Sequence, residues 1–371
     1  MNLIESLYIH FPFCRHLCNY CDFYKTIPKG SEDLGLFEKL FLEMESEHAI
    51  LLDRLGYEME NLKTLYIGGG TPSLWGERGA HFLAKQFERM GIRFDEEREF
   101  TLEVNPGTWT EEGIQAWREF GINRFSLGIQ SLRADYLKYL DRVHSVEDVF
   151  DTLNFFNQNK LNFSVDFMLG LPESLKLERN ILGELEQILK FSPEHISLYI
   201  LTPKANYPFK ARLPTDDFLE EEYLRVADFL SEKGFDHYEV SNFASGKRNY
   251  SQHNLRYWRS EAVGALGPSA VGFLPEHRFR YKWQVSSPKF TKEEIEIESL
   301  DLEKLYMGLR INEGIRLDDH FSSVELSELS EVFKKWELGG LARSRAGVLS
   351  LTSRGFIVLD TLIDQIFLTT K

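Results

Sequence analysis

Cysteine is almost absent from this chain of 371 residues, which has only three, and all of them lie between positions 14 and 21. An odd number of cysteines within one short window argues against an extracellular fold held together by disulfides. Thiols that remain reduced are typical of a cytoplasmic protein, and we expect that location.

Basic charge and long apolar runs are also scarce. Lysine and arginine number 43 against 58 aspartates and glutamates, which leaves a formal net charge of −15. Proteins that bind nucleic acid usually have a basic surface, so no nucleic-acid partner is expected. No apolar run approaches the roughly 18 residues of a membrane span, and the first residues, MNLIESLYIHF, lack the features of a secretory signal. Membrane association is expected to be peripheral at most.

The chain does contain a repeated pattern of apolar, β-rich runs, each ending in glycine, proline or short polar residues. Such runs suit strands that are buried on both faces of a parallel sheet. Amphipathic helical stretches lie between them, and one of these has Thr215 as its predicted N-cap and Gly234 after its end. Repeated βα units predict an α/β fold, specifically a complete or partial barrel. The seven runs are SLYIHFP from Ser6, TLYIGGGTP from Thr64, EFTLEVNP from Glu99, RFSLGIQS from Arg124, NFSVDFMLGLP from Asn162, HISLYILTP from His195 and DHYEVSNF from Asp236.

The pattern changes after about residue 285. The stretch VSSPKFTKEE is typical of a polar linker, which predicts two domains, 1–285 and 286–371. In the second domain, a short VLSL strand before a final apolar helix is typical of a small helical, winged-helix-like module. Such modules often bind DNA, but from residue 290 onward 10 Lys and Arg stand against 15 Asp and Glu, a net charge of −5. A packing or lid role is therefore expected.

Polar residues and glycines gather where the predicted strands end. In a βα barrel, these carboxyl ends and the loops after them form the active face. The cysteine loop follows the first strand and GGGTP ends the second, while Glu103 and Asn105 end the third, Gln130 the fourth and Asp166 the fifth. One such acid alone would more often be a helix cap or an exposed side chain. Their recurrence at equivalent positions predicts a shared site.

The three cysteines, Cys14, Cys18 and Cys21, have the spacing C-x3-C-x2-C. Short-spaced thiolates in a reducing compartment usually hold a soft metal, although three inert, buried cysteines are the simplest alternative. A zinc site would need a fourth ligand, which His10 or His16 could supply. An iron–sulfur cluster normally takes four thiolates, so three would leave one iron of a [4Fe–4S] cluster open to another molecule. The spacing alone leaves both metals open.

This cysteine motif, after the first strand of a βα barrel, resembles the signature of the radical S-adenosylmethionine (SAM) enzymes. The resemblance implies a partial (βα)6 barrel whose three cysteines hold a [4Fe–4S] cluster, with the amine and carboxylate of SAM on the open iron. One electron from the cluster would then cleave SAM. Tyr20 matches the aromatic residue that this superfamily places near adenine.

Eleven ordered segments, covering nearly the whole chain, resemble the oxygen-independent coproporphyrinogen III oxidase family. They are YIHFPFC, GGGTPS, LEVNP, NRFSLGIQS, LDRVH, DFMLGLP, ISLY, YEVSNFA, HNLRYW, ALGPSA and LTSRG. The resemblance implies that Gly69, Gly70 and Thr71 hold the methionyl amine of SAM, that Glu103 contacts the methionine or ribose, and that Gln130, Arg142 and Asp166 line the ribose and carboxylate. It also implies that Thr202 and Val271 contact the adenine side and that Tyr8 lies near the position of the SAM-binding aromatic residue of the first strand.

Two branches of this family differ at the cysteine motif. The decarboxylating oxidase ends the motif in CxC and has a long N-terminal extension, whereas here Asp22 and Phe23 follow Cys21 and only seven residues precede Tyr8. CNYCDFY and HNLRYW resemble instead the haem chaperone branch, which nominates His253 as a haem ligand; neutral imidazole is a suitable axial ligand. This chain has GPSAV where that branch usually has GPGAH.

We therefore predict a haem chaperone that binds haem or a porphyrin, an acceptor protein and an electron-donor protein. One alternative is a genuine radical SAM enzyme, either the coproporphyrinogen III oxidase (a dehydrogenase) or another porphyrin-modifying enzyme. A second is a zinc-stabilised barrel with a binding role only. Whether the protein is itself an enzyme stays open at this point.

Overall fold

Six parallel strands form the centre of the molecule, in the positions predicted for the first six apolar runs. The computed structural model describes residues 2–370, and its largest sheet has nine strands in the order β11-β2-β4-β5-β6-β7-β8-β10-β9. Neighbours from β2 to β8 are all parallel, and β11 is parallel to β2. These strands are β2 (Ser6–Phe11), β4 (Asn61–Gly69), β5 (Arg93–Val104), β6 (Arg124–Gln130), β7 (Phe163–Leu169), β8 (His195–Ile200), β9 (Asp236–Glu239), β10 (Asn242–Ala244) and β11 (Gly264–Leu266).

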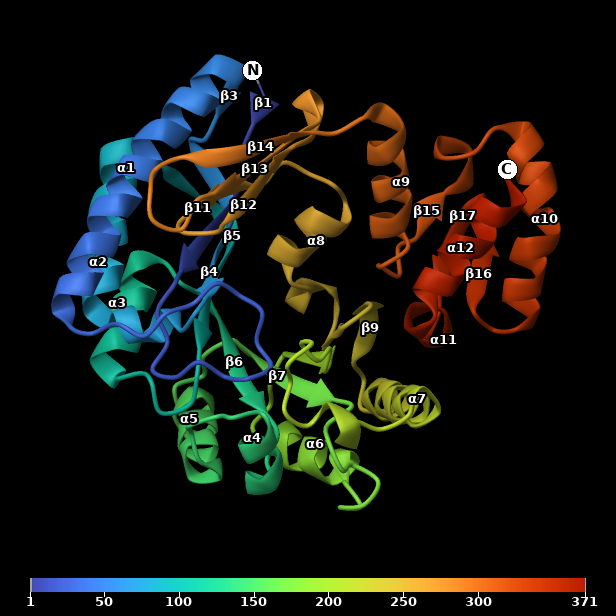
Figure 1. The fold of residues 1–371 in the computed structure, drawn as a ribbon, viewed down its shortest axis with the longest axis horizontal. Coiled ribbons are helices and arrows are strands. Elements are labelled where there is room, and N and C mark those ends of the chain that lie inside the picture. Colours follow the sequence, from blue (N-terminus) through green and yellow to red (C-terminus); the bar gives the residue numbers. More distant parts are fainter. Residues whose placement is uncertain (1, 371) are drawn as a thin grey trace.

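Helices follow the strands and cover the outer face of the sheet, which makes the fold a partial (βα)6 barrel as predicted (Figure 1). The predicted N-cap is confirmed, because the Thr215 side chain accepts from Phe218 N and Gly234 follows the helix with φ +85°. No helix within residues 2–370 is both long enough and apolar enough to cross a membrane. The helices are α1 (Ser31–Leu55), α2 (Gly76–Met90), α3 (Glu111–Phe120), α4 (Ala134–Tyr139), α5 (Val146–Gln158), α6 (Ile181–Leu189) and α7 (Asp216–Glu232).

Strand alternation separates an apolar outer layer from a polar interior. Leu65 and Ile67 on β4 belong to the main core beneath the helices. Tyr66, between them, points to the opposite face, where its hydroxyl donates to Glu103 Oε1 on β5 at 2.9 Å. The barrel interior is therefore lined by groups that can contact a polar ligand.

The seventh predicted strand does not continue the parallel series. DHYEVSNF forms a hairpin in which β9 and β10 are antiparallel, and β10 is antiparallel to β8. Only Val240 and Ser241 lie between the two strands, whereas a parallel connection needs a crossover of a dozen or more residues. The prediction of a parallel βα unit was wrong here for that reason.

The predicted linker around residues 285–294 was also wrong, because it contains a strand. β14 (Phe290–Glu294) pairs with β13 (Phe279–Trp283), which pairs with β12 (Val271–Leu274). The Phe290 ring packs against Trp283 with centroids 5.2 Å apart and joins the main core. This one apolar anchor holds an otherwise polar segment in a sheet, so the first unit extends beyond the predicted boundary at 285.

A short helix, α8 (Gln252–Trp258), lies at the amino ends of the barrel strands, opposite the cysteine loop. Glu99 of β5 accepts from the backbone nitrogens of Gln252 and His253 at 2.9 and 3.0 Å. We call this part of the barrel its closed end, and the part at the carboxyl ends of the strands its mouth.

The C-terminal unit has a separate apolar core that begins with Leu305. The predicted VLSL strand is β17 and the predicted final helix is α12. This unit lies beside β9 (Figure 1), where Val240 N donates to Arg310 O at 2.9 Å and His237 Nδ1 lies 2.7 Å from Ser353 Oγ. Its elements are α9 (Ile297–Gly308), α10 (Ser323–Leu338), α11 (Ser353–Ile357), α12 (Leu359–Thr369) and the antiparallel strands β15 (Ile315–Arg316), β16 (Ala342–Arg345) and β17 (Val348–Leu351). Outside this unit, β1 (Asn2–Leu3) and β3 (Tyr57–Glu58) form a small parallel pair near the N-terminus.

Candidate cofactor site

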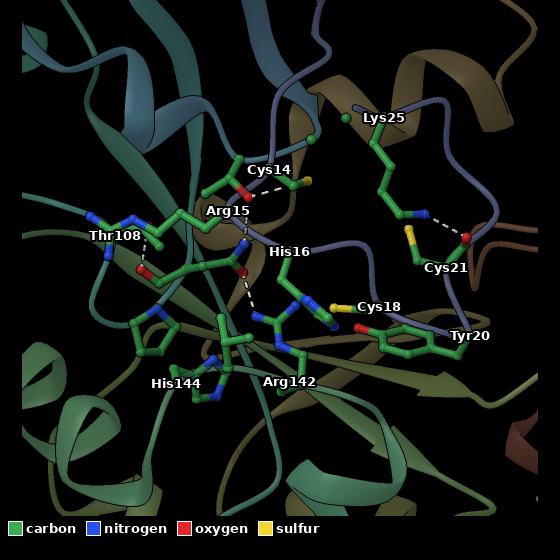
Figure 2. Close-up of a pocket in the computed structure, with 16 residues that line it drawn as sticks. Cys14, Arg15, His16, Cys18, Tyr20, Cys21, Lys25, Thr108, Arg142 and His144 are labelled. Carbon is green, nitrogen blue, oxygen red and sulfur yellow. Dashed lines mark hydrogen bonds between the residues drawn. The ribbon is translucent and has the colours of Figure 1, made fainter. Parts of the chain in front are cut away.

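The cysteine loop, residues 12–30, joins β2 to α1 and is held by hydrogen bonds within itself. Cys14 N donates to Thr26 O at 2.9 Å, Thr26 N donates to Pro12 O at 2.8 Å, and Lys25 Nζ donates to Cys21 O at 2.6 Å. Cys14 is buried, and the two other cysteines are half-buried. Figure 2 shows the sulfur atoms of all three cysteines around one pocket.

The glycine segment 68–70 packs directly against the cysteine loop. Gly70 N donates to Phe11 O and Thr71 N donates to Phe13 O, both at 2.7 Å. A Cβ atom on Gly70 would lie 2.6 Å from Phe13 O, so any larger residue would force the two segments apart. The GGGTP turn is therefore required for the placement of the cysteines.

A cavity of about 400 Å³ opens at the mouth of the barrel, a size within the range of small-molecule sites. It adjoins the smaller pocket beside the thiols, and Tyr20, Asn105 and Arg142 line both. The two together collect all but three of the predicted site residues. Tyr20, Cys21, Gly69, Gly70, Glu103, Gln130, Arg142, Asp166 and Thr202 line the cavity, and Cys14, Cys18 and Thr71 line the smaller pocket.

Two half-buried acids face this cavity from β5 and β7, the strands on either side of β6. Glu103 Oε2 accepts from Gly69 N at 3.0 Å, and burial, with the nearby Asp166 adding to it, raises the pKa of Glu103 to about 7. Asp166 accepts from Ser126 Oγ at 3.0 Å, and burial raises its pKa as well. Ionised carboxylates in such positions would accept hydrogen bonds from amines or hydroxyls of a ligand.

The guanidinium of Arg142 and the side-chain amide of Gln130 line the same cavity. Arg142 Nη2 donates to Asn105 Oδ1 at 2.6 Å and to Gly128 O at 2.8 Å, and its guanidinium lies beside Cys18 and Tyr20. Gln130 has φ +69°, just after a break in the β6–β7 register. A non-glycine residue in that region costs on the order of 1 kcal/mol, and such strain is concentrated at functional sites.

Three predicted residues lie outside the cavity. The Tyr8 hydroxyl bonds to His10 Nδ1 at 3.0 Å, and its ring stacks behind Tyr66 with centroids 6.2 Å apart. Val271 begins β12 and is partly exposed. His253 lies at the closed end, on α8.

His253 is 1% exposed and stacks on Tyr66 with ring centroids 5.4 Å apart. Its Nδ1 lies 2.9 Å from Thr64 Oγ1, while its buried Nε2 has no hydrogen-bond partner among residues 2–370. Burial, together with Arg256 and Arg124, lowers the pKa of His253 to about 3. The imidazole is therefore neutral, with one nitrogen anchored, which is the state of a metal-binding histidine.

The two histidines considered as zinc ligands are engaged elsewhere. His10 uses Nδ1 for the Tyr8 hydroxyl and Nε2 for Tyr24 O at 2.8 Å, and His16 Nε2 lies 2.9 Å from Asp141 Oδ2. In the part of the chain that the structure describes, no three His, Cys, Asp or Glu side chains converge as ligands of one metal ion.

Several cavity residues had no predicted role. Tyr66 on β4 and Ser126 on β6 line the cavity. Strand alternation places Ser126 on the same face as Gly128, which also lines the cavity, so this pattern could have identified it. Asn105 was predicted to lie at the active face, but no contact with SAM was predicted for it. Phe23 lines the cavity from the cysteine loop, where no periodic pattern exists that could have identified it.

The fold and the cysteine pocket agree with comparisons to known proteins. Residues 8–185 match the model of the radical SAM superfamily. The structure of coproporphyrinogen III oxidase (HemN) from Escherichia coli, described as a radical SAM enzyme, is similar with a TM-score of 0.77 at 18% identity, over 98% of this chain and 90% of that one. At that identity the likeness shows a shared fold. The chain is a radical SAM protein.

Sequence relatives define the family more narrowly. The "Heme chaperone HemW" of Bacillus subtilis is 30% identical over 383 residues, covering 95% of this chain and 96% of the relative, and that of Lactococcus lactis is 30% identical over 338 residues, covering 85% and 83%. "Radical S-adenosyl methionine domain-containing protein 1, mitochondrial" of Danio rerio is 32% identical over 384 residues, covering 96% and 82%. The chain belongs to the HemW family, as its resemblance to the haem chaperone branch predicted. Membership of the superfamily implies a [4Fe–4S] cluster and SAM.

Proposed function

We propose that this protein is a haem chaperone, which binds haem and delivers it to acceptor proteins. The observation that carries the proposal is the 30% identity to proteins named Heme chaperone HemW over as much as 95% of the chain. The cysteine motif supports it, because Asp22 and Phe23 stand where the oxidase pattern has a further cysteine.

The residues of the two pockets fit the implied cofactors. Cys14, Cys18 and Cys21 would hold the cluster, whose chemistry is to supply one electron to SAM. Arg142 would face the SAM carboxylate, since a guanidinium pairs well with that group. The remaining cavity residues would surround SAM, with Gly69, Gly70 and Thr71 beside the amine, Glu103, Gln130 and Asp166 beside the methionine and ribose, and Tyr20 and Thr202 beside adenine.

We assign the haem ligand to His253. Its Nε2 has no hydrogen-bond partner within residues 2–370 and its Nδ1 is anchored on Thr64, which suits a neutral axial ligand. Because the ring is 1% exposed, haem can reach it only if α8 moves away from the closed end. Tyr257, 5.3 Å from His253 between ring centroids, would move with the same helix.

The proposal implies three kinds of partner in the cytoplasm. Haem or a porphyrin is the ligand that is carried, an acceptor protein receives it, and an electron-donor protein reduces the cluster. Exposed apolar side chains stand at the mouth, with Phe23 67% and Val143 64% exposed at the rims of the two pockets. Such side chains could contact a macrocycle or a protein partner.

Haem titration of the anaerobically reconstituted protein tests this proposal. Wild type is expected to bind haem with a shifted Soret band, and His253→Ala to lose that shift. His277→Ala, which removes an exposed histidine, is the matched control and should bind as wild type does. An unshifted Soret band in wild type, or release of carbon dioxide from coproporphyrinogen III during anaerobic turnover, would overturn the proposal in favour of an enzyme.

A further inference from the structure

A chain of three hydrogen bonds joins Arg142 to Cys14 across the smaller pocket (Figure 2, dashed lines). Arg142 Nη2 donates to Asn105 Oδ1 at 2.6 Å, and Asn105 Nδ2 donates to Thr71 Oγ1 at 2.9 Å. Thr71 Oγ1 in turn donates to Cys14 Sγ at 3.5 Å. The chain thus begins at a cation and ends at a cluster thiol.

The direction of these bonds follows from the chemistry of the groups. A guanidinium can only donate, so the Asn105 oxygen must face Arg142 and its amide nitrogen must face Thr71. The Thr71 hydroxyl accepts from that nitrogen, which leaves its own hydrogen for the sulfur. Arg142 therefore determines the orientation of a hydroxyl two residues away along the chain of bonds.

Further contacts hold Thr71 and Asn105, the two middle members of this chain of bonds, in place. Thr71 is 3% exposed and its nitrogen donates to Phe13 O, one residue before Cys14. Asn105 O accepts from Thr108 Oγ1 at 2.6 Å. On the other side, a Cβ atom on Gly128 would lie 2.5 Å from Asn105 Oδ1, so glycine is needed there to leave room for the amide.

We propose that Thr71 is a positioning residue that raises the reduction potential of the cluster through its hydrogen bond to Cys14, and that Asn105 and Arg142 orient it. The proposal depends on a cluster bound by the three cysteines, and it is independent of haem transport.

The physical reason is the charge that reduction adds. Hydrogen bonds to the sulfur ligands are among the features that set the potential of iron–sulfur clusters. An added electron makes the thiolate sulfurs more negative, so a donor to Cys14 stabilises the reduced cluster more than the oxidised one. Its loss should make reduction less favourable by about tenfold, which corresponds to about 59 mV for one electron.

The test is a redox titration of the reconstituted full chain. The electron paramagnetic resonance signal of the reduced cluster is measured at each potential. Thr71→Val keeps the branched shape and removes the hydroxyl, and its midpoint potential is expected to fall. Thr71→Ser keeps the hydroxyl, so its midpoint potential should equal that of wild type. Thr152→Val is the matched control, because it makes the same substitution on α5, where Thr152 Oγ1 donates to Asp148 O at 2.7 Å.

An unchanged potential in Thr71→Val at wild-type iron content would overturn the proposal, as would an equal fall in Thr152→Val. If Thr71→Val does not assemble a cluster, Asn105→Ala provides the second test, since it leaves the hydroxyl but removes the group that orients it. A smaller fall in potential is expected there, and no fall would overturn the proposal. None of these measurements uses haem, so they remain informative if the haem titration fails.

Discussion

Glu103 lies at the mouth of the barrel, whereas Glu239, at the end of β9, lies beside Trp258 of α8, the helix of the closed end. The two carboxyl groups have similarly raised pKa values in different surroundings. Burial raises the pKa of each carboxyl to about 7. Glu103 is half-buried and faces the 400 Å³ cavity, whereas Glu239 is 0% exposed and lies among Asn242, Arg310 and Trp258. A shifted pKa therefore does not by itself identify a cofactor site, because burial alone produces it.

Two buried histidines at the closed end are likewise paired with protein groups. His195 Nε2 pairs with the Tyr238 hydroxyl at 2.8 Å, and His253 Nδ1 pairs with Thr64. At the mouth, by contrast, the polar groups surround open space. Substitutions at the mouth are therefore expected to affect the cluster and SAM, whereas substitutions at the closed end should leave both unchanged and lower stability.

The largest expected effect is that of Cys14→Ser. Loss of one of three thiolates should reduce the iron content from about four atoms per chain to well below one. Iron and sulfide analysis after anaerobic reconstitution, together with visible absorption, measures this. Glu239→Gln at the closed end should retain its iron, and loss of iron there would contradict the distinction between the two ends.

Glu103→Gln should weaken SAM binding by about 10- to 100-fold. The amide removes the charge that would accept hydrogen bonds from SAM, a loss of about 1.4 to 2.7 kcal/mol. Isothermal titration of the reconstituted protein measures the affinity, with Glu239→Gln as the control. Equal affinities in wild type and Glu103→Gln would show that this acid does not contact SAM.

His253→Ala should lower the free energy of unfolding by about 2 to 4 kcal/mol, because it removes a buried ring and leaves Thr64 without its partner. Urea denaturation of the apoprotein measures this change. Iron content and SAM affinity should remain at wild-type values. A fall in either would mean that the closed end contributes to the cofactor site.

The smallest expected effect is on the pH dependence of stability. Glu239 has an ordinary pKa of 4.5 and a folded pKa of about 7, so between these values the folded state holds more protons and stability falls as pH rises. Glu239→Gln should reduce the loss of stability between pH 5.5 and 7.5 by about 1 to 2 kcal/mol. Denaturation at both pH values measures it, and a wild-type slope in the variant would show that Glu239 does not titrate in this range.

Much of this architecture was predictable because local patterns and global contacts agree. The runs that became β2 to β8 are buried on both faces, so their apolar composition reflects their environment directly. DHYEVSNF was grouped with these runs, but its two-residue turn forces an antiparallel hairpin. Phe290 lies in a polar stretch, and only its contact with Trp283 reveals the strand.

The sequence by itself determined the cysteine spacing, the order of βα units and the family, because these depend on residue type and short-range periodicity. Only the tertiary structure decided which polar residues share a cavity. As residue types, histidine and glutamate are equally good candidates for a ligand-binding site. His253, however, is buried on α8, whereas Glu103 faces the open cavity. The hydrogen bonds from Arg142 to Cys14 likewise join four segments that are distant in sequence, and they exist because parallel strands bring their carboxyl ends to the same edge of the sheet.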